Sequence, residues 1–157
     1  MAEPNGPIIR RYEKNPILTK HDVPYPVETV HNAGVVKYNG KYVMLFRSHL
    51  RNGRSIIGLA ESSDGVRFAV RPEPFITPAK AQPFAGYEAF GVEDPRICPM
   101  EDGYLITYSA YSQHGVRMAL ARTTDFERLE RISLITQADY RNVVIFPEKI
   151  GGRYARL

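Results

Sequence analysis

The chain has 157 residues, of which 43% are hydrophobic and 24% charged, and its formal net charge of +4 arises from 15 Arg and 6 Lys dispersed along the sequence. This composition is typical of a globular protein with its own core, and no run of basic residues indicates a nucleic-acid-binding surface. No stretch has the length and apolarity of a signal peptide or membrane span. The lone cysteine, Cys98, excludes an internal disulfide framework and a cysteine-cluster metal site. We therefore expect a cytoplasmic protein without nucleic-acid or membrane partners.

Four short strands are predicted in the first half of the chain, each separated from the next by a turn signal. Asn-Gly between apolar runs is a strong hairpin signal. It occurs at Asn39-Gly40 and again at Asn52-Gly53, and Ser63-Asp64-Gly65 supplies a third turn. The pattern predicts an antiparallel meander with strands over residues 34–38, 42–47, 55–62 and 66–70.

The same pattern recurs in the second half of the chain. Apolar runs over 104–111 and 116–122 are separated by His114-Gly115, and residues 59–64 match residues 120–125, which lie 61 positions later. A third copy opens over residues 143–148. We therefore expect blade-like repeats over about residues 32–70, 92–135 and 143–157.

A repeat of four short strands is typical of a β-propeller blade, and no long window keeps the 3.6-residue period of a helix. The sequence thus predicts an all-β fold with one domain over residues 1–157. Propellers need at least four blades to close, so we expect an incomplete N-terminal part of about two and a half blades. Its last repeat would present an unpaired strand edge and an uncovered apolar face, and both promote association into a homo-oligomer.

The segment Gly91-Val92-Glu93-Asp94-Pro95-Arg96-Ile97 places two acids and an arginine within four residues. Pro95 biases Asp94 away from the helical region, so an extended backbone is expected. Glu93 and Asp94 would then point to opposite faces, while Asp94 and Arg96 would share one. Asp94 is thus interpreted as a carboxylate aimed by a stiff segment. The alternative is a turn aspartate with a structural ion pair.

Four motifs, taken in order, resemble glycoside hydrolase family 130. They are Asn32-Ala33-Gly34-Val35, Gly53-Arg54-Ser55 with Gly58-Leu59-Ala60, residues 91–97, and Phe146-Pro147-Glu148-Lys149-Ile150. The resemblance runs from about Asn15 to the last residue and covers about the first half of a family member. The family contains β-mannoside phosphorylases and some β-mannosidases on a five-bladed β-propeller, so the resemblance implies that fold and one of these activities.

The resemblance also implies roles for individual residues. Asp94 corresponds to the general acid, which passes its proton through a sugar hydroxyl. Glu93 is expected to face the opposite way and is therefore assigned a structural role. Asn32 and Arg47 correspond to contacts with the sugar next to the cleaved bond, and Arg141 to a phosphate contact. Further substrate-binding candidates are Arg54, Tyr87 and Glu88, the last two on the acceptor side.

The residues themselves leave alternatives open. Arg47 also fits an edge-strand solubility charge, Arg54 a solvated turn residue, and Arg141 a surface charge. The four histidines show no metal-ligand spacing. His31 fits a position near the site, but a surface or structural histidine is the favoured interpretation.

A framed acid with many arginines favours phosphate as the nucleophile, because an anion needs cationic partners, whereas water needs a second carboxylate. We expect inverting phosphorolysis of a β-mannoside oligosaccharide to α-mannose 1-phosphate and a shortened acceptor. Inorganic phosphate would be the co-substrate, with no metal or organic cofactor. The alternatives are a β-mannosidase of the same fold and a non-catalytic carbohydrate-binding propeller. The 157-residue chain by itself is expected to be poorly active.

Overall fold

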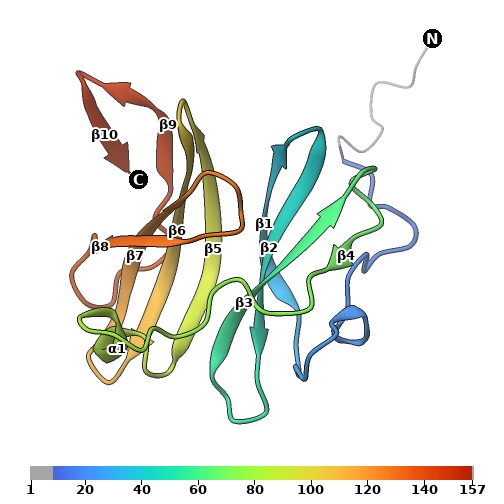
Figure 1. Cartoon of the computed structure of the whole chain (residues 1–157), viewed down its shortest axis with the longest axis horizontal. Helices are drawn as coiled ribbons and strands as arrows, with labels where there is room; N and C mark the ends of the chain where they lie inside the picture. Colours follow the sequence, from blue (N-terminus) through green and yellow to red (C-terminus); the bar gives the residue numbers. More distant parts are fainter. Residues whose placement is uncertain (1–8, 157) are drawn as a thin grey trace.

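A computed structural model describes residues 9–156, which form β-strands with very little helix (Figure 1). The elements are η1 (Lys20–Asp22), β1 (His31–Tyr38), β2 (Lys41–His49), β3 (Ser55–Ser62), β4 (Ala69–Val70), α1 (Phe84–Tyr87), β5 (Gly91–Met100), β6 (Gly103–Ser112), β7 (Gly115–Thr123), β8 (Glu130–Leu134), β9 (Ile145–Ile150) and β10 (Arg153–Arg156). The prediction of an all-β fold is confirmed.

The strands form two antiparallel meanders that lie side by side (Figure 1). In the first, β1, β2, β3 and β4 pair in chain order. In the second, β5, β6, β7 and β8 do the same. The two meet where Ser55 of β3 pairs in parallel with Gly91 of β5. Strands β9 and β10 form a separate two-stranded sheet.

The two meanders turn from their third to their fourth strand in the same way. In the first, Asp64 Oδ1 accepts from the backbone N–H groups of Val66 and Arg67. In the second, Asp125 Oδ1 accepts from the corresponding groups two and three residues further on, at 2.8 and 3.0 Å. The sequence match between residues 59–64 and 120–125 therefore reflects a repeated turn. Because this turn occupies residues 66 and 67, β4 is shorter than the predicted strand over 66–70.

The main hydrophobic core lies between the two meanders. Successive side chains of a strand point to opposite faces, and β2 is apolar on both. Val43 and Leu45 pack into the core shared with the second meander. Met44 and Phe46 face the other way and are covered by the segment that precedes β1. β2 is therefore a central strand, and Arg47, the next residue along it, is held in a rigid position.

A close backbone contact at Gly91 sets the start of β5 against the start of β3. Gly91 has φ 137°, and a Cβ built there would lie 2.4 Å from the backbone nitrogen of Ser55. Only glycine tolerates this angle together with this proximity. The junction fixes the segment that carries Asp94, three residues further on.

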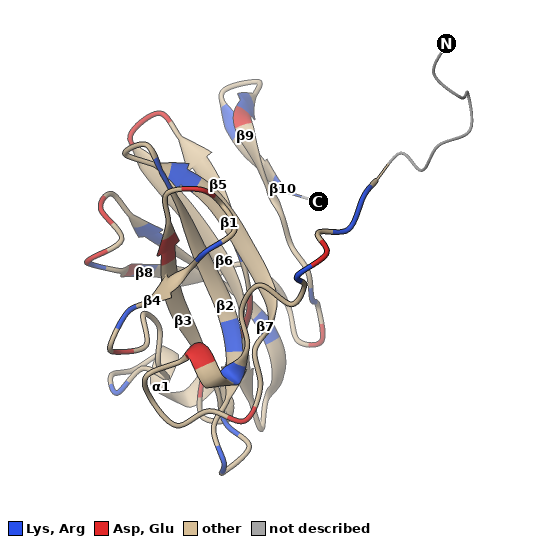
Figure 2. Cartoon of the chain, turned by 90° about the vertical axis from the view of Figure 1, so that its right-hand side faces the viewer, with Lys and Arg blue, Asp and Glu red and all other residues tan. Residues whose placement is uncertain are grey.

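Charged side chains are spread over the molecule. Figure 2 shows basic and acidic positions interspersed along the strands and turns. Within residues 9–156 no helix is long and apolar enough to cross a membrane.

We predict that Gly91→Ala destabilises the fold more than Gly53→Ala does. Both glycines have positive φ, so each substitution strains the backbone, by about 1–2 kcal/mol in the left-handed region that Gly53 occupies. Gly53 has open space around it, whereas the new methyl group at position 91 collides with the Ser55 backbone. Urea denaturation of the two variants measures the difference. Equal free energies of unfolding would show that the junction accommodates a side chain.

Candidate active site

Two bulged strands bring Asn32 and Asp94 together. The pairing register shifts at Asn32 in β1 and at Asp94 in β5. Both residues have left-handed backbone angles, with φ of 50° and 52°. Residues other than glycine adopt such angles rarely, and bulges and functional sites are common places for them. Asn32 Nδ2 donates a hydrogen bond to Asp94 Oδ1 at 2.8 Å, so the two strained residues hold each other across β1 and β5.

Gly34 allows β1 and β5 to approach this closely. A Cβ built at Gly34 would lie 2.9 Å from the carbonyl oxygen of Pro95, and a side chain there would push the strands apart. The glycine of the Asn-Ala-Gly motif therefore has a steric reason to be present beside the polar Asn32.

The guanidinium of Arg47 joins β2 to two carboxylates of β5. Nη1 donates to Asp94 Oδ1 at 3.2 Å, and Nη2 donates to Glu93 Oε1 at 2.8 Å. The Arg47 side chain is only 15% exposed. A buried guanidinium needs such partners, so the two acids account for the position of Arg47 beneath the site surface.

Glu93 is the buried support of the cluster. Its side chain is 6% exposed. Oε1 accepts from Ser55 Oγ at 2.7 Å as well as from Arg47. Oε2 lies 3.7 Å from Nη1 of Arg141, a half-exposed side chain. The structure thus places Arg141 beside the Asp94 cluster, with Glu93 between them.

The surroundings of Asp94 keep it ionised. Burial by itself would raise the pKa of Asp94. The hydrogen bonds from Asn32 and Arg47, with the positive charges of Arg47 and Arg96, outweigh burial and hold the pKa of Asp94 below its usual value. Asp94 is therefore a carboxylate at neutral pH in this state.

The prediction of an extended backbone at Asp94 is wrong. The bulge places an extra residue in β5 at this point, so Glu93 and Asp94 reach the same guanidinium instead of pointing to opposite faces. The guanidinium that binds Asp94 belongs to Arg47. Arg96 donates instead to the carbonyl oxygen of Pro95, at 3.0 Å.

Glu88 does not belong to the candidate site. It is wholly buried, and its carboxylate accepts from Tyr108 Oη at 2.7 Å and from the backbone nitrogen of Ala79 at 2.7 Å. Nε and Nη2 of Arg131 each donate to it at 3.0 Å. A carboxylate with four donors has no room for a sugar hydroxyl, so the prediction that Glu88 binds substrate is corrected. Glu88 instead anchors the segment around α1 to β6 and β8.

Tyr87 and Arg54 lie away from the cluster's hydrogen bonds. The Tyr87 ring packs 5.6 Å from the ring of His114 and 5.3 Å from the guanidinium of Arg117. Arg54 lies exposed in the β2–β3 turn, where its backbone N–H donates to Asn52 Oδ1. Neither residue contacts Asp94 in the part of the chain described. Substrate binding by Tyr87 and Arg54 therefore remains a prediction.

Two supporting residues were missed from the sequence. Ser55 holds Glu93, and His49 Nε2 lies 2.9 Å from Arg47 Nη2. A usable signal existed for His49, because residues two apart on a strand share a face. Ser55 belongs to the Gly53-Arg54-Ser55 motif, but no local rule connects it with Glu93, which is 38 residues away.

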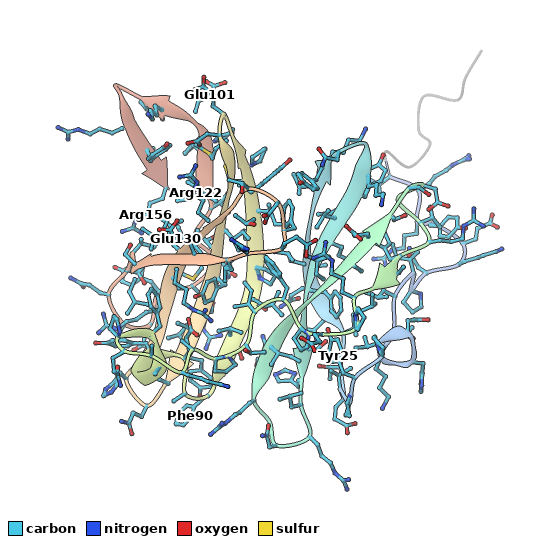
Figure 3. The ribbon with its side chains drawn as sticks, viewed as in Figure 1. Tyr25, Phe90, Glu101, Arg122, Glu130 and Arg156 are labelled. Carbon is cyan, nitrogen blue, oxygen red and sulfur yellow. The ribbon has the colours of Figure 1, made fainter. Side chains whose placement is uncertain are left out.

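In Figure 3 the labelled residues Phe90 and Glu101 flank the two ends of β5, and Asp94 is the fourth residue from the Phe90 end. An open groove borders the cluster at Asn32. The groove has a volume of about 530 Å³, and its walls include His31, Asn32, Leu18 and Met44. Within residues 9–156 no three His, Cys, Asp or Glu side chains are grouped to hold a metal ion.

Comparisons with known proteins show which family the chain resembles along its length. The family described as beta-1,4-mannooligosaccharide phosphorylase matches residues 2–156. Beta-1,2-mannobiose phosphorylase of Listeria innocua is 30% identical to the chain, and the match covers 95% of the chain and 57% of the relative. 4-O-beta-D-mannosyl-D-glucose phosphorylase of Bacteroides fragilis is also 30% identical, over 95% of the chain and 41% of the relative.

A solved structure is similar in fold. The complex of the Listeria innocua beta-1,2-mannobiose phosphorylase with beta-1,2-mannobiose matches with a TM-score of 0.80 at 29% identity, over 93% of this chain and 56% of that one. The chain therefore spans about half the length of the curated relatives it matches.

We predict that Asn32→Ala raises the pKa of Asp94 towards its ordinary value, because the ionised carboxylate loses a hydrogen-bond donor. A pH titration followed by the ¹³C shift of the Asp94 carboxyl measures the change. Asn52→Ala is the matched control, since Asn52 serves the exposed β2–β3 turn. An unchanged Asp94 titration in Asn32→Ala would mean that Arg47 alone sets the charge state.

Proposed function

The chain belongs to glycoside hydrolase family 130, and on this premise we propose that it takes part in the inverting phosphorolysis of β-mannosides. A phosphate oxygen attacks C1 of the mannosyl unit from the face opposite the leaving group. The C1–O bond to the acceptor breaks, and the acceptor oxygen takes up the proton given by Asp94 through a sugar hydroxyl. The products are α-mannose 1-phosphate and an acceptor shortened by one mannosyl unit.

The observation that carries the proposal is the Asp94 carboxylate, which has a free oxygen and belongs to one cluster with Arg47 and Arg141. Asp94 uses Oδ1 for Asn32 and Arg47, and Oδ2 has no hydrogen-bond partner among the described residues. The second carboxylate of the cluster, Glu93, is buried and bound by Ser55 and Arg47. It is therefore poorly placed to activate water, as a hydrolase would require.

The charges suit an anionic nucleophile. Arg141 is half exposed and stands behind Glu93, and arginine binds phosphate well through its planar fork. A phosphate held there would offset the positive charge that keeps Asp94 ionised. Its arrival would raise the pKa of Asp94 and favour the protonated acid that the leaving oxygen needs. Binding of the nucleophile and loading of the acid would thus be linked.

The substrate contacts follow from the same geometry. Asn32 lies both on the cluster and in the wall of the adjoining groove, so a mannosyl unit in the groove would reach Asn32, the residue that donates to Asp94. The groove is the place we assign to the β-mannoside oligosaccharide.

The remaining parts of the proposal concern architecture and setting. We assign the meanders to two blades of a five-bladed β-propeller and the β9–β10 hairpin to a third. The repeated turn and the superposition on the Listeria innocua structure support this assignment.

We assign the reaction to the cytoplasm, supported by the lone cysteine. Inorganic phosphate is the co-substrate, and the proposed chemistry needs no metal or organic cofactor.

The first test of the proposal is phosphate dependence. Incubation of the protein with β-1,2- or β-1,4-mannobiose should yield mannose 1-phosphate only when phosphate is present. Chromatography of the products with and without phosphate measures this. Free mannose formed equally in both would favour a β-mannosidase, and binding of mannobiose without any product would favour a carbohydrate-binding propeller.

A second test concerns Asp94 as the general acid. Asp94→Asn keeps the shape of the side chain but cannot donate the proton, so kcat should fall by about a hundred- to ten-thousandfold. The fall should be smaller for aryl mannosides, whose leaving groups need little protonation. Circular dichroism and urea denaturation establish that the variant is folded. Undiminished turnover of mannobiose by Asp94→Asn would assign Asp94 a structural role.

A further inference from the structure

His49 is held between the candidate site and the segment that precedes β1. It is the last residue of β2, two positions after Arg47. Its Nε2 lies 2.9 Å from Nη2 of Arg47, and its Nδ1 lies 3.0 Å from Oγ1 of Thr29. The backbone N–H of His49 donates to the same Thr29 oxygen, at 3.0 Å. Both ring nitrogens therefore have a partner.

The partner of Nε2 decides which form of the ring fits. Arginine offers N–H donors and no acceptor. Nε2 of His49 must therefore present its lone pair to Arg47, and the ring proton must sit on Nδ1, where it donates to Thr29. The structure accommodates a neutral His49 of one tautomer. A protonated ring would turn an N–H towards the Arg47 N–H and place two positive charges next to each other.

The hydrogen bond to His49 completes the set of partners of the Arg47 Nη2 atom. One Nη2 hydrogen serves Glu93 and the other serves His49. With both used, the plane of the guanidinium is fixed, and Nη1 is directed at Asp94. Nε of Arg47 is buried and has no partner among the described residues, so it does not assist in this orientation.

We propose that His49 is a positioning residue: as the neutral Nδ1–H tautomer it orients Arg47 towards Asp94, and its protonation loosens that hold. The inference deepens the proposed function and rests on it for the effect on turnover. The effect on the ionisation of Asp94 does not depend on that function.

Several charged groups face His49 from the neighbouring elements. His31 of β1 packs against it with ring centroids 5.2 Å apart. Glu93 and Asp94 of β5 reach it through Arg47. The backbone N–H of Glu28 donates to the carbonyl of His49, while the Glu28 side chain lies 3.6 Å from Lys20.

Of these neighbours, His31 resists protonation beside the Arg47 guanidinium. Burial, followed by the charge of Arg47, lowers the pKa of His31. The second ring of the stack therefore adds little positive charge next to Arg47.

Two substitutions separate positioning from a purely structural role. His49→Gln places an amide group near the position of Nε2, where its oxygen can accept from Arg47 at every pH. His49→Asn places its amide near the position of Nδ1, so it keeps the contact with Thr29 and loses the one with Arg47. If His49 serves to position Arg47, His49→Gln should have the smaller effect on the site. If His49 only anchors the segment before β1, His49→Asn should have the smaller effect.

Nuclear magnetic resonance provides a readout that needs no turnover. Long-range ¹H–¹⁵N spectra should show His49 as the Nδ1–H tautomer at neutral pH. The ¹³C titration of the Asp94 carboxyl should lie at lower pH in His49→Gln than in His49→Asn, because the amide oxygen of Gln can hold Arg47 at every pH. An Nε2–H tautomer at neutral pH, or equal Asp94 titrations in the two variants, would overturn the proposal.

The kinetic arm uses the phosphorolysis assay. His49→Asn should lower kcat by about a hundredfold, as expected for a displaced catalytic group, with a smaller change in KM. His49→Gln should retain most of the rate. Because Gln does not take up a proton, the rate of this variant should fall less than that of wild type as the pH is lowered. Equal losses of rate in the two variants would contradict positioning. If no protein turns over mannobiose, the proposed function fails while the resonance data still decide the role of His49.

Discussion

The Arg47 guanidinium is the interaction on which the candidate site depends. It arises from the central strand of the first meander and binds two consecutive carboxylates of the second. Glu93 is almost fully buried, and a buried carboxylate without a cation is strongly destabilising. Arg47 therefore serves the fold and the site at once, because it neutralises Glu93 with one nitrogen and sets Asp94 with the other.

Local strain in the site is concentrated beside this ion pair. Asn32 and Asp94 both hold left-handed backbone angles, and Gly34 and Gly91 sit where a side chain would collide with backbone. Such features persist only where the surrounding structure compensates for them. Here the surrounding structure is the shared core, in which Val43, Leu45 and Val92 are fully buried. Packing energy gained in the core thus maintains the geometry near the start of β5.

The sequence was sufficient for features determined by local patterns. Asn39-Gly40 gives the first hairpin as expected, and the repeated Asp turns follow from the matching residues. The motif around Asp94 directed attention to the correct segment, since its glycine, acids and proline are contiguous. These features need only short-range physics: turn angles, strand periodicity and the restriction before proline.

What the sequence did not reveal depends on contacts between distant residues. A period-two pattern contains no sign of the extra residue that bends β5, so it predicts the wrong direction for the Asp94 side chain and puts Arg96, instead of Arg47, on the same face. Arg47 lies 47 positions before Asp94, and no local rule connects them. Glu88 looked like a site residue because it precedes the motif, but Arg131, 43 positions later, holds it in the interior.

The shared core also determines how the site can be lost. Because the core residues of one meander are covered by those of the other, neither can open without exposing both. Arg47 comes from one side of this seam and Asp94 from the other, so separating the two requires breaking the largest cooperative unit of the fold. The segment before β1 packs on a different cluster at the outer face of β2. Local opening there would free the groove and the Thr29 contact while the ion pair stayed intact, so access to the site and its integrity are governed by separate motions.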